Sequence, residues 1–434
     1  MKIKNLTKIF LFVAVAALFS CSSSEDGNSD GGGATGPASI SVTASAQYVN
    51  FGTDVTFTVK TNEGTDVTSD ATIQINGSSI QGAVYNATQT GEYTVRATFE
   101  DLTSTQITVT VLPIIVDVDV QTSQATYNLG DRIDFRVMAI DNDGNAIDVT
   151  DVSEVFISGS ESYNTGSIVI PGVVGDVEAY ATFDEFTSDP KTVSVEDNGN
   201  TPGSFTRKAL IEDFTGTWCG WCPRVSQGIE LCMDVSDNVV AVGVHIGDFM
   251  ENTYGSQIAN AFNVNSFPTA YVNRSAVWAY PENSNVNQVT SQATGTTQNG
   301  IAINSAIKGR DMSFIVSAGF GQNVNGARLV VLLLENGISA NQSNYTSFYG
   351  AVDPIPNFVH DHVLRYAFTS VMGDAVPAGQ SSSGNSFRLK YDYNIPTNLV
   401  VNADSVEIVA MLLDSNGEII NVNVAKAGEF TDFN

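Results

Sequence analysis

The first half of the chain repeats itself, and this repeat is the feature that most limits the possible fold. Two pairs of segments match: YVNFGTDVTFTV (48–59) with TYNLGDRIDFRV (126–137), and EYTVRATFEDLTSTQITVTV (92–111) with DVEAYATFDEFTSDPKTVSV (176–195). In each copy, short runs of alternating apolar and polar residues are separated by Gly, Asn and Asp, which is the pattern of half-buried strands joined by turns. The copies are offset by about 80 residues, enough for one small β-domain. The repeat therefore predicts two β-sandwich modules in tandem, over residues 38–113 and 114–196.

The N-terminus carries the pattern of an export signal. Lys2, Lys4 and Lys8 precede an apolar run over residues 9–19. A basic stretch followed by about 11 apolar residues is typical of a secretory signal peptide and is too short to span a bilayer. We therefore predict a signal peptide over residues 1–20.

Cys21 stands at the position where a signal peptide is cut. The tetrapeptide Leu18-Phe19-Ser20-Cys21 resembles the bacterial lipobox. This resemblance implies that Cys21 is acylated on its sulfur and becomes the new N-terminus, so that it is an anchor and not a redox residue. An ordinary signal peptide that is cut elsewhere is the alternative.

Residues 21–37 are rich in Ser, Gly and acidic residues and cannot bury a core, so we expect a flexible tether. An acidic Ser/Asp/Glu cluster directly after an acylated cysteine resembles the export signal of surface-exposed lipoproteins. The expected location is the outer membrane, at the periplasmic face or the cell surface, and the cluster favours the surface.

The charge of the chain limits its partners. Removal of the signal takes away three of the 19 basic residues and none of the 47 acidic ones, which leaves a formal charge of −31. Such a surface repels phosphate backbones and anionic lipid headgroups. We therefore exclude nucleic acid as a partner and expect contact with the membrane only through the N-terminal lipid.

The two predicted β-modules resemble bacterial immunoglobulin-like domains. Neither contains Cys, His or Trp, so no catalytic constellation is present in them. A spacer role is favoured because nothing in the modules offers a site, and binding of a glycan or a protein partner is the alternative.

The pattern changes after a linker of turn residues at 197–205. Beyond it we expect strands at 209–214, 239–246 and 267–274, and helices at 223–235 and 254–263. The segment VVAVGVHI (239–246) is continuously apolar, as in a buried parallel strand. The alternation of strands and helices predicts an α/β domain over residues 206–290.

Two of the four cysteines, Cys219 and Cys222, lie at the start of the first expected helix. There the sulfur of Cys219 is close to unpaired N–H groups and the positive end of the helix, which lowers the pKa of its thiol. Cys222 is one turn away and can resolve a mixed disulfide. Gly220 permits a tight turn, and Pro223 falls in the first helical turn, where its missing N–H matters least.

These residues resemble a known fold. Asp213-Phe214, then Trp218-Cys219-Gly220-Trp221-Cys222, then Phe267-Pro268-Thr269 have the order and spacing of the thioredoxin fold. With EDFTGTWCGWCPR (212–224), the later NFVHDHVLR (357–365) and the lipobox, the chain resembles the outer membrane protein 28-related lipoproteins over roughly its C-terminal 230 residues. The immunoglobulin-like modules lie outside this resemblance.

The resemblance implies roles for further residues. Asp213 would be a buried acid under the cysteine pair that moves a proton to or from the resolving cysteine. Pro268 would be a cis-proline beside the sulfurs, and with Thr269 it would expose a strand edge to a substrate peptide. Trp218 and Trp221 would form an apolar rim for that peptide, with packing as the other role of Trp218.

Alternatives remain for the cysteine pair. A zinc site needs a second pair of ligands. The remaining thiol, Cys232, is more typical of a buried small hydrophobe, and His245 is the nearest histidine in sequence. We therefore expect no metal at the pair and no other cofactor. A structural disulfide is a serious rival to a redox-active pair, because outside the inner membrane the two cysteines tend to be oxidised.

The three histidines are weaker candidates. His360 and His362 flank Asp361, and on a strand they would share one face. They could present two imidazoles to a metal, but no third ligand is evident nearby, and hydrogen bonding or packing is favoured. His245 ends an expected parallel strand, at the edge where the cysteine pair should also lie.

After residue 290 the alternating pattern returns, with a hairpin signal at Asn416-Gly417. We predict a β-sandwich-like domain over residues 291–434. The segment AVDPIPNFVHDHVLR (351–365) is expected to be an irregular insert that covers the α/β domain or presents a surface to a partner.

Together these features predict a multidomain protein with all-β immunoglobulin-like sandwiches, an α/β thioredoxin-like domain and a C-terminal β-sandwich-like domain. The predicted function is thiol–disulfide exchange on protein thiols or disulfides, with an unidentified redox partner; the sequence fixes neither the direction of exchange nor whether the chain is an enzyme. The alternative is a non-enzymatic surface binding or adhesion protein, in which the disulfide is structural.

Overall fold

The computed structural model describes residues 37–159, 166–197, 203–431 and 433. The expected signal peptide, Cys21 and nearly all of the tether lie outside these residues. The described chain forms two compact units that divide between Val111 and Leu112. None of its helices is both long and apolar enough to cross a membrane.

The first unit is built on the first repeat. Its strands are β1 (Ile40–Ala44), β2 (Tyr48–Asn50), β3 (Asp54–Thr61), β4 (Thr72–Ile75), β5 (Ser78–Ser79), β6 (Val84–Asn86), β7 (Gly91–Phe99), β8 (Leu102–Thr103) and β9 (Ile107–Leu112). One sheet has the order β1-β3-β6, and the other has the order β2-β9-β7-β4-β5, with β8 beside β7. Phe57 and Val59 of the first sheet pack with Val95 and Ala97 of the second. The expected β-sandwich is therefore present here.

The second repeat begins the second unit. It contains β10 (Ile115–Gln121), β11 (Thr126–Asn128), β12 (Ile133–Asp134), β13 (Arg136–Asp141), β14 (Ala146–Asp148), a short 3₁₀ helix (Thr150–Val152), β15 (Glu154–Gly159), β16 (Ile168–Val169), β17 (Gly175–Phe183), β18 (Phe186–Thr187) and β19 (Lys191–Glu196). Its main sheets have the orders β10-β13-β14 and β11-β19-β17-β15. Strands β17 and β19 pair as β7 and β9 do in the first repeat, with Gly175 opposite Val195 and Gly91 opposite Val111.

The α/β segment follows. It contains β20 (Phe205–Thr206), β21 (Ala209–Thr215), α1 (Pro223–Val235), β22 (Val239–His245), α2 (Thr253–Ala261), β23 (Thr269–Val272), β24 (Ala276–Val277), a 3₁₀ turn (Glu282–Ser284), α3 (Val286–Thr290) and β25 (Thr296–Thr297). Strand β21 is parallel to β22 and antiparallel to β23. All residues of β21 are buried, because helices cover both of its faces.

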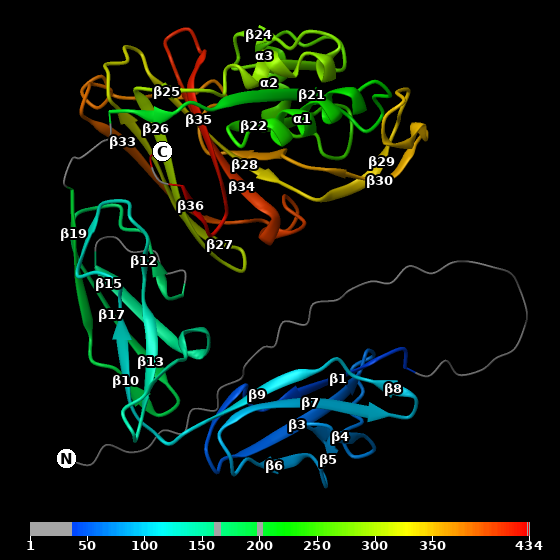
Figure 1. The fold of residues 1–434 in the computed structure, drawn as a ribbon, viewed down its shortest axis with the longest axis vertical. Helices are drawn as coiled ribbons and strands as arrows, with labels where there is room; N and C mark the ends of the chain where they lie inside the picture. The colour runs from blue at the N-terminus through cyan, green and yellow to red at the C-terminus, as the bar shows by residue number, and fades with distance from the viewer. Residues whose placement is uncertain (1–36, 160–165, 198–202, 432, 434) are drawn as a thin grey trace, which may run out of the picture. The chain divides into compact units, whose positions relative to one another are not determined.

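Side chains alternate along β21, and this alternation explains how its two faces are covered; Figure 1 shows the ribbons of β21, α1 and α2. Ala209 and Ile211 pack with residues of α1, whereas Leu210 and Phe214 pack with residues of α2. Successive side chains of a strand point to opposite faces of the sheet, so α1 and α2 lie on opposite sides. The loop between β21 and α1 lies at one end of this sheet.

The remaining strands are β26 (Asn299–Lys308), β27 (Asp311–Phe320), β28 (Arg328–Glu335), β29 (Ile338–Gln342), β30 (Ile355–His360), β31 (Val363–Ala367), β32 (Asp374–Ala375), β33 (Ser386–Asn394), β34 (Val406–Leu413), β35 (Ile419–Lys426) and β36 (Phe430–Thr431), with 3₁₀ turns at Tyr349–Ala351 and Ala403–Ser405. They do not form a separate sandwich. One sheet has the order β24-β23-β21-β22-β31-β28-β34-β35, so it crosses the domain boundary that we expected at residues 290/291. A second sheet, β33-β27-β26-β36, packs against its C-terminal strands.

The segment 351–365 is not the irregular insert that we expected. It forms β30, which pairs with β29, and β31, which lies inside the large sheet between β22 and β28. Val363, Leu364 and Ala367 are buried there. The sequence concealed β31 because a central strand of only five residues has too few alternations to reveal its pattern.

Candidate functional site

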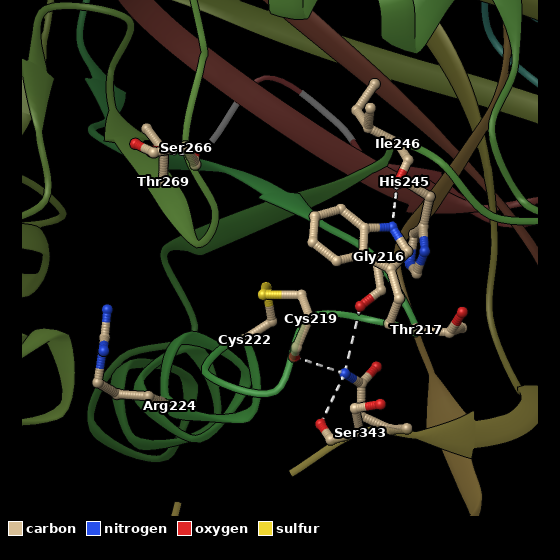
Figure 2. Close-up of a disulfide and its surroundings, with 12 residues drawn as sticks. Gly216, Thr217, Cys219, Cys222, Arg224, His245, Ile246, Ser266, Thr269 and Ser343 are labelled. Atoms are coloured by element: carbon tan, nitrogen blue, oxygen red, sulfur yellow. Dashed lines mark hydrogen bonds between the residues drawn. A yellow bond between two sulfur atoms is a disulfide. The ribbon is translucent and has the colours of Figure 1, made fainter. Parts of the chain in front are cut away.

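Cys219 and Cys222 form a disulfide in the loop between β21 and α1 (Figure 2). Pro223 begins α1, a position at which proline is favoured because the missing N–H has no helical partner anyway. Both half-cystines are almost buried, with 3% of Cys219 and 1% of Cys222 exposed. The two cysteines are thus joined to each other, and α1 begins at the residue where the sequence analysis placed the start of the helix.

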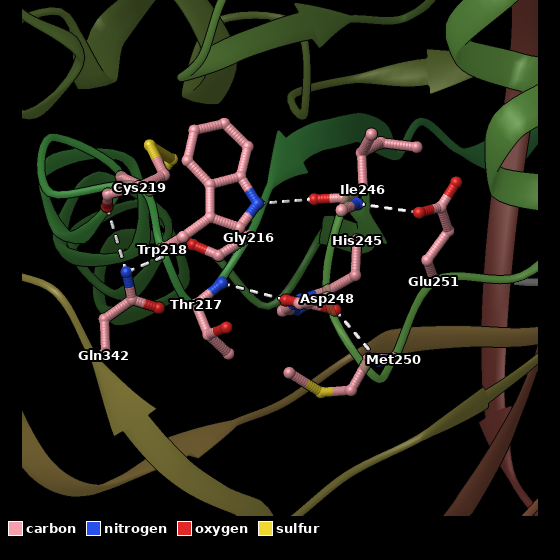
Figure 3. A network of polar contacts seen from close by, with 12 residues as sticks. Gly216, Thr217, Trp218, Cys219, His245, Ile246, Asp248, Met250, Glu251 and Gln342 are labelled. Carbon is pink, nitrogen blue, oxygen red and sulfur yellow. Dashed lines mark hydrogen bonds and ion pairs between the residues drawn. A yellow bond between two sulfur atoms is a disulfide. The ribbon is translucent and has the colours of Figure 1, made fainter.

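The loop is held by the segment that follows β22. The backbone N–H of Thr217 donates to Oδ2 of Asp248 over 2.8 Å. The indole N–H of Trp218 donates to the carbonyl of Ile246 over 2.8 Å. Asp248 also accepts a hydrogen bond from the backbone N–H of Met250, which fixes the carboxylate (Figure 3). The sequence analysis did not identify Asp248, although it stands just past the carboxyl end of a parallel strand, where sites in α/β sheets gather.

A second segment, 123 residues beyond Cys219 in the sequence, also holds the loop. The side-chain amide of Gln342 donates to the carbonyls of Gly216 and Cys219 over 3.2 and 3.0 Å (Figure 3). The backbone N–H groups of Ser343 and Tyr345 donate to the carbonyls of Thr217 and Gly220. No local pattern in the sequence signals this contact.

Asp213 lies near the end of β21 and is buried on the face covered by α1. Burial, followed by the charge of Glu282, raises the pKa of its carboxyl to about 8, although Arg224 acts in the opposite direction. Its Oδ1 atom has no hydrogen-bond partner among the described residues. Arg224 lies in the first turn of α1 and pairs with Glu282. Asp213 is therefore a protonated acid at neutral pH, on the strand that leads into the disulfide loop.

Aromatic side chains flank the disulfide. Trp218 is 48% exposed and its ring meets that of Phe267 edge to face, with 5.4 Å between the centroids. Trp221 is 51% exposed and meets the ring of Tyr345 at 6.0 Å. The contact of Trp218 with Phe267 brings the segment before β23 next to the disulfide loop.

The Phe267–Pro268 peptide bond in that segment is cis. Thr269 begins β23, and its hydroxyl donates to the carbonyl of Ser266 over 2.8 Å (Figure 2). The structure thus brings Pro268, Thr269 and the two tryptophans to the same end of the sheet as the cysteine pair.

The two histidines expected to share a face are separated. His360 ends β30, whereas His362 lies in the following turn, with a φ of 57°, and its Nδ1 is 3.2 Å from Glu407. The chain turns between them, so the strand geometry assumed for a metal pair does not arise. Among the described residues, no group of three or more His, Cys, Asp and Glu side chains is placed to hold a metal ion.

His360 lies beside His245 instead, with 5.1 Å between the ring centroids. Burial and the neighbouring His245 lower the pKa of His360 to about 4, against the opposite effect of Asp248. Nδ1 of His245 is 2.8 Å from the carboxylate of Asp248. Cys232 is a free, buried thiol on α1, and burial raises its pKa to about 12.

Residues 255–430 match the family of outer membrane protein Omp28. The match begins after the cysteine pair and covers the greater part of the large sheet. Over this region the chain is similar to Omp28, and an outer-membrane protein is the class that the match supports.

Several solved structures resemble the chain at low identity. HBP35 of Porphyromonas gingivalis is 21% identical, with a TM-score of 0.40 over 52% of this chain and 77% of that one. Domains 5-6 of the S-layer protein SbsC are 18% identical, with a TM-score of 0.16 over 37% of this chain and 98% of that one. The Yersinia pseudotuberculosis adhesin InvE is 16% identical, with a TM-score of 0.17 over 38% of this chain and 60% of that one. Likeness at this level says nothing about activity.

Proposed function

We propose that this chain is a lipid-anchored outer-membrane protein that exchanges thiols and disulfides with other exported proteins through Cys219 and Cys222. The observation that carries the proposal is the disulfide at the start of α1, preceded in β21 by a buried acid whose pKa is about 8. The parallel pairing of β21 with β22 and the cis-proline segment beside the loop support a thioredoxin-like domain.

The chemistry needs this chain, a protein disulfide or dithiol as substrate, and a redox partner whose dithiol or disulfide returns the Cys219–Cys222 pair to its starting state. In the reducing direction, the Cys219 thiolate attacks one sulfur of a substrate disulfide and releases the other substrate sulfur as a thiolate. Cys222 then attacks the sulfur of Cys219, which frees the second substrate thiol and leaves the chain oxidised. In the opposite direction, the Cys219–Cys222 disulfide accepts two electrons from a substrate dithiol. No cofactor takes part in either direction.

Neighbouring residues would assist each step. The unpaired N–H groups at the start of α1 stabilise the thiolate of Cys219. Asp213, which is protonated at neutral pH, can donate its proton to the thiolate of Cys222 when that residue leaves, and its carboxylate form can accept the proton of the Cys222 thiol when that residue attacks. Trp218, Trp221 and Thr269 would contact the substrate peptide beside Pro268.

A second candidate function is favoured by the burial of the two half-cystines, which leaves little room for an attacking thiol. In this alternative the disulfide is structural, and the chain is a non-enzymatic binding or adhesion protein. Its β-modules would then supply the binding surface.

The reduction potential of the pair separates the two candidates. We expect the full chain, with Cys21→Ser to prevent acylation, to have a potential of roughly −270 to −120 mV and a Cys219 thiol with a lowered pKa. Equilibration with redox buffers and the pH dependence of alkylation measure these quantities, and Cys219→Ala is the control. A potential below about −300 mV, with an ordinary thiol pKa, would instead establish a structural disulfide.

The lipid anchor is tested separately. We expect the unmodified chain to incorporate radioactive palmitate and to fractionate with outer membranes, whereas Cys21→Ser should remove both properties. Digestion of intact cells with protease then distinguishes the cell surface from the periplasmic face. Membrane association of Cys21→Ser at the level of the unmodified chain would refute acylation as the anchor.

A further inference from the structure

The disulfide loop is bound by a segment that we call the strap, residues 342–349, which begins at the last residue of the hairpin strand β29. The strap donates hydrogen bonds to the carbonyls of Gly216, Thr217, Cys219 and Gly220. These four carbonyls lie on the loop that carries the disulfide. The strap therefore fixes the backbone on both sides of Cys219.

Gln342 makes the central contact. Only 2% of the residue is exposed, and Nε2 donates to the carbonyls of Gly216, Cys219 and Ser343 over 3.2, 3.0 and 3.1 Å. An amide nitrogen carries two hydrogens, so three acceptors use its whole donor capacity. With the amide flipped, its oxygen would face these carbonyl oxygens, so the observed orientation is the one that satisfies the loop; Figure 3 shows the contacts with Gly216 and Cys219.

The remainder of the strap is fixed by its own contacts. The amide of Asn344, which is buried, donates to the carbonyls of Phe348 and Val352 over 3.0 and 3.2 Å. The ring of Tyr345 lies against Gly220, where an added Cβ would approach the ring to 2.4 Å. The strap is thus held in a defined conformation against the loop.

These contacts are formed while the pair is oxidised. In the reduced chain no covalent bond holds the two sulfurs together, so the position of Cys219 depends on the hydrogen bonds of its loop. A support that restricts this freedom raises the effective concentration of one thiol at the other. It thereby favours closure of the disulfide and lowers the reduction potential.

We propose that the strap sets the reduction potential of the Cys219–Cys222 pair and that Gln342 is its principal positioning residue. The proposal rests on the proposed function, because it concerns how that same pair is tuned for exchange. According to this proposal, the reduction potential depends on the strap and not only on the motif Cys-Gly-Trp-Cys.

The test measures the reduction potential of Gln342→Ala and Gln342→Met in the full chain carrying Cys21→Ser. Methionine keeps the length and burial of glutamine but removes the N–H donors, so it remains informative if alanine prevents folding. Loss of these neutral hydrogen bonds is expected to shift the thiol–disulfide equilibrium about tenfold toward the thiols, which is about 30 mV less negative for this two-electron couple. Reduction by dithiothreitol should accelerate in parallel.

Asn421→Ala is the matched control. Asn421 on β35 is also a buried amide, and its Nδ2 donates to the carbonyls of Thr206 in β20 and Asn299 in β26 over 3.0 and 3.2 Å. Asn421→Ala should lower the free energy of unfolding without changing the reduction potential of the Cys219–Cys222 pair. An unchanged potential in folded Gln342→Met, or an equal shift in Asn421→Ala, would overturn the proposal.

The failure of this proposal can be told apart from the failure of the proposed function. A wild-type potential below about −300 mV with no exchange on a disulfide-bonded protein rejects the function, while the shift in Gln342→Met is still measured. An exchange-active chain whose potential does not respond to Gln342 rejects the strap alone.

Discussion

Replacing Arg274 by alanine is expected to lower the free energy of unfolding by about 3–5 kcal/mol at neutral pH. Nε and Nη2 of Arg274 donate hydrogen bonds to the carboxylate of Glu212 over 2.6–3.2 Å. Nη1 donates to the carbonyl of Val371. Neither of the paired side chains is exposed. Removal of the arginine leaves a charged carboxylate in the core without a partner, and this uncompensated charge is the main cost.

Urea unfolding followed by tryptophan fluorescence measures this effect. All three tryptophans, Trp218, Trp221 and Trp278, belong to the α/β segment, so the signal reports on the sheet that contains Glu212. Arg388→Ala is the control, since the pair of Arg388 with Asp197 is partly exposed and should contribute less than about 1 kcal/mol. Equal losses of unfolding free energy in the two variants would show that burial of the Arg274–Glu212 pair does not determine how much the pair stabilises the fold.

Asp213→Asn is expected to have the opposite effect, a gain in stability that depends on pH. Asp213 is the neighbour of Glu212 in β21, but its carboxylate lacks a paired cation. Burial therefore raises the pKa of Asp213 from 3.8 to about 8. The folded state therefore binds a proton that the unfolded state releases. The stability associated with this proton is complete below about pH 4 and is lost as the pH rises through about 8.

The amide of asparagine does not titrate and so avoids this loss. We expect Asp213→Asn to unfold with a free energy about 3–5 kcal/mol higher than the wild type at pH 9, with the gain disappearing toward pH 4. Urea unfolding of the oxidised chain at a series of pH values measures it. Asp234→Asn, which removes an exposed carboxylate from α1, is the control and should show little change. A gain that does not vary with pH would contradict the raised pKa.

Local sequence patterns were sufficient to predict the helix and the strand on either side of the disulfide loop. The expected helix 223–235 coincides with α1, because proline at its start and the spacing of Val225, Ile229 and Cys232 are signals contained in the segment itself. The expected strand 209–214 is one residue shorter than β21. The order of the Cys pair and Pro268 also placed the cis peptide bond correctly, through the resemblance to thioredoxin folds.

Contacts between segments that are distant in the sequence could not be predicted from local patterns. Gln342 is one polar residue at the end of a short strand, and only its position over the carbonyl of Cys219 distinguishes it from other glutamines. His360 was grouped with His362 by sequence distance, whereas the turn after β30 places it beside His245. The boundary expected at residues 290/291 followed a change of pattern, but hydrogen bonding between β22 and β31 continues the sheet across it.

The strand order of the large sheet has a consequence for synthesis of the chain. Because a polypeptide is made from its N-terminus, Cys219 and Cys222 leave the ribosome before Gln342, β31 or β34. The strands β21 and β22 then still lack β31, which closes the edge of β22, and the strap that holds the loop. The two thiols are therefore exposed on an unfinished sheet at that stage, and the burial seen around the disulfide is acquired only after the strap and β31 have been added.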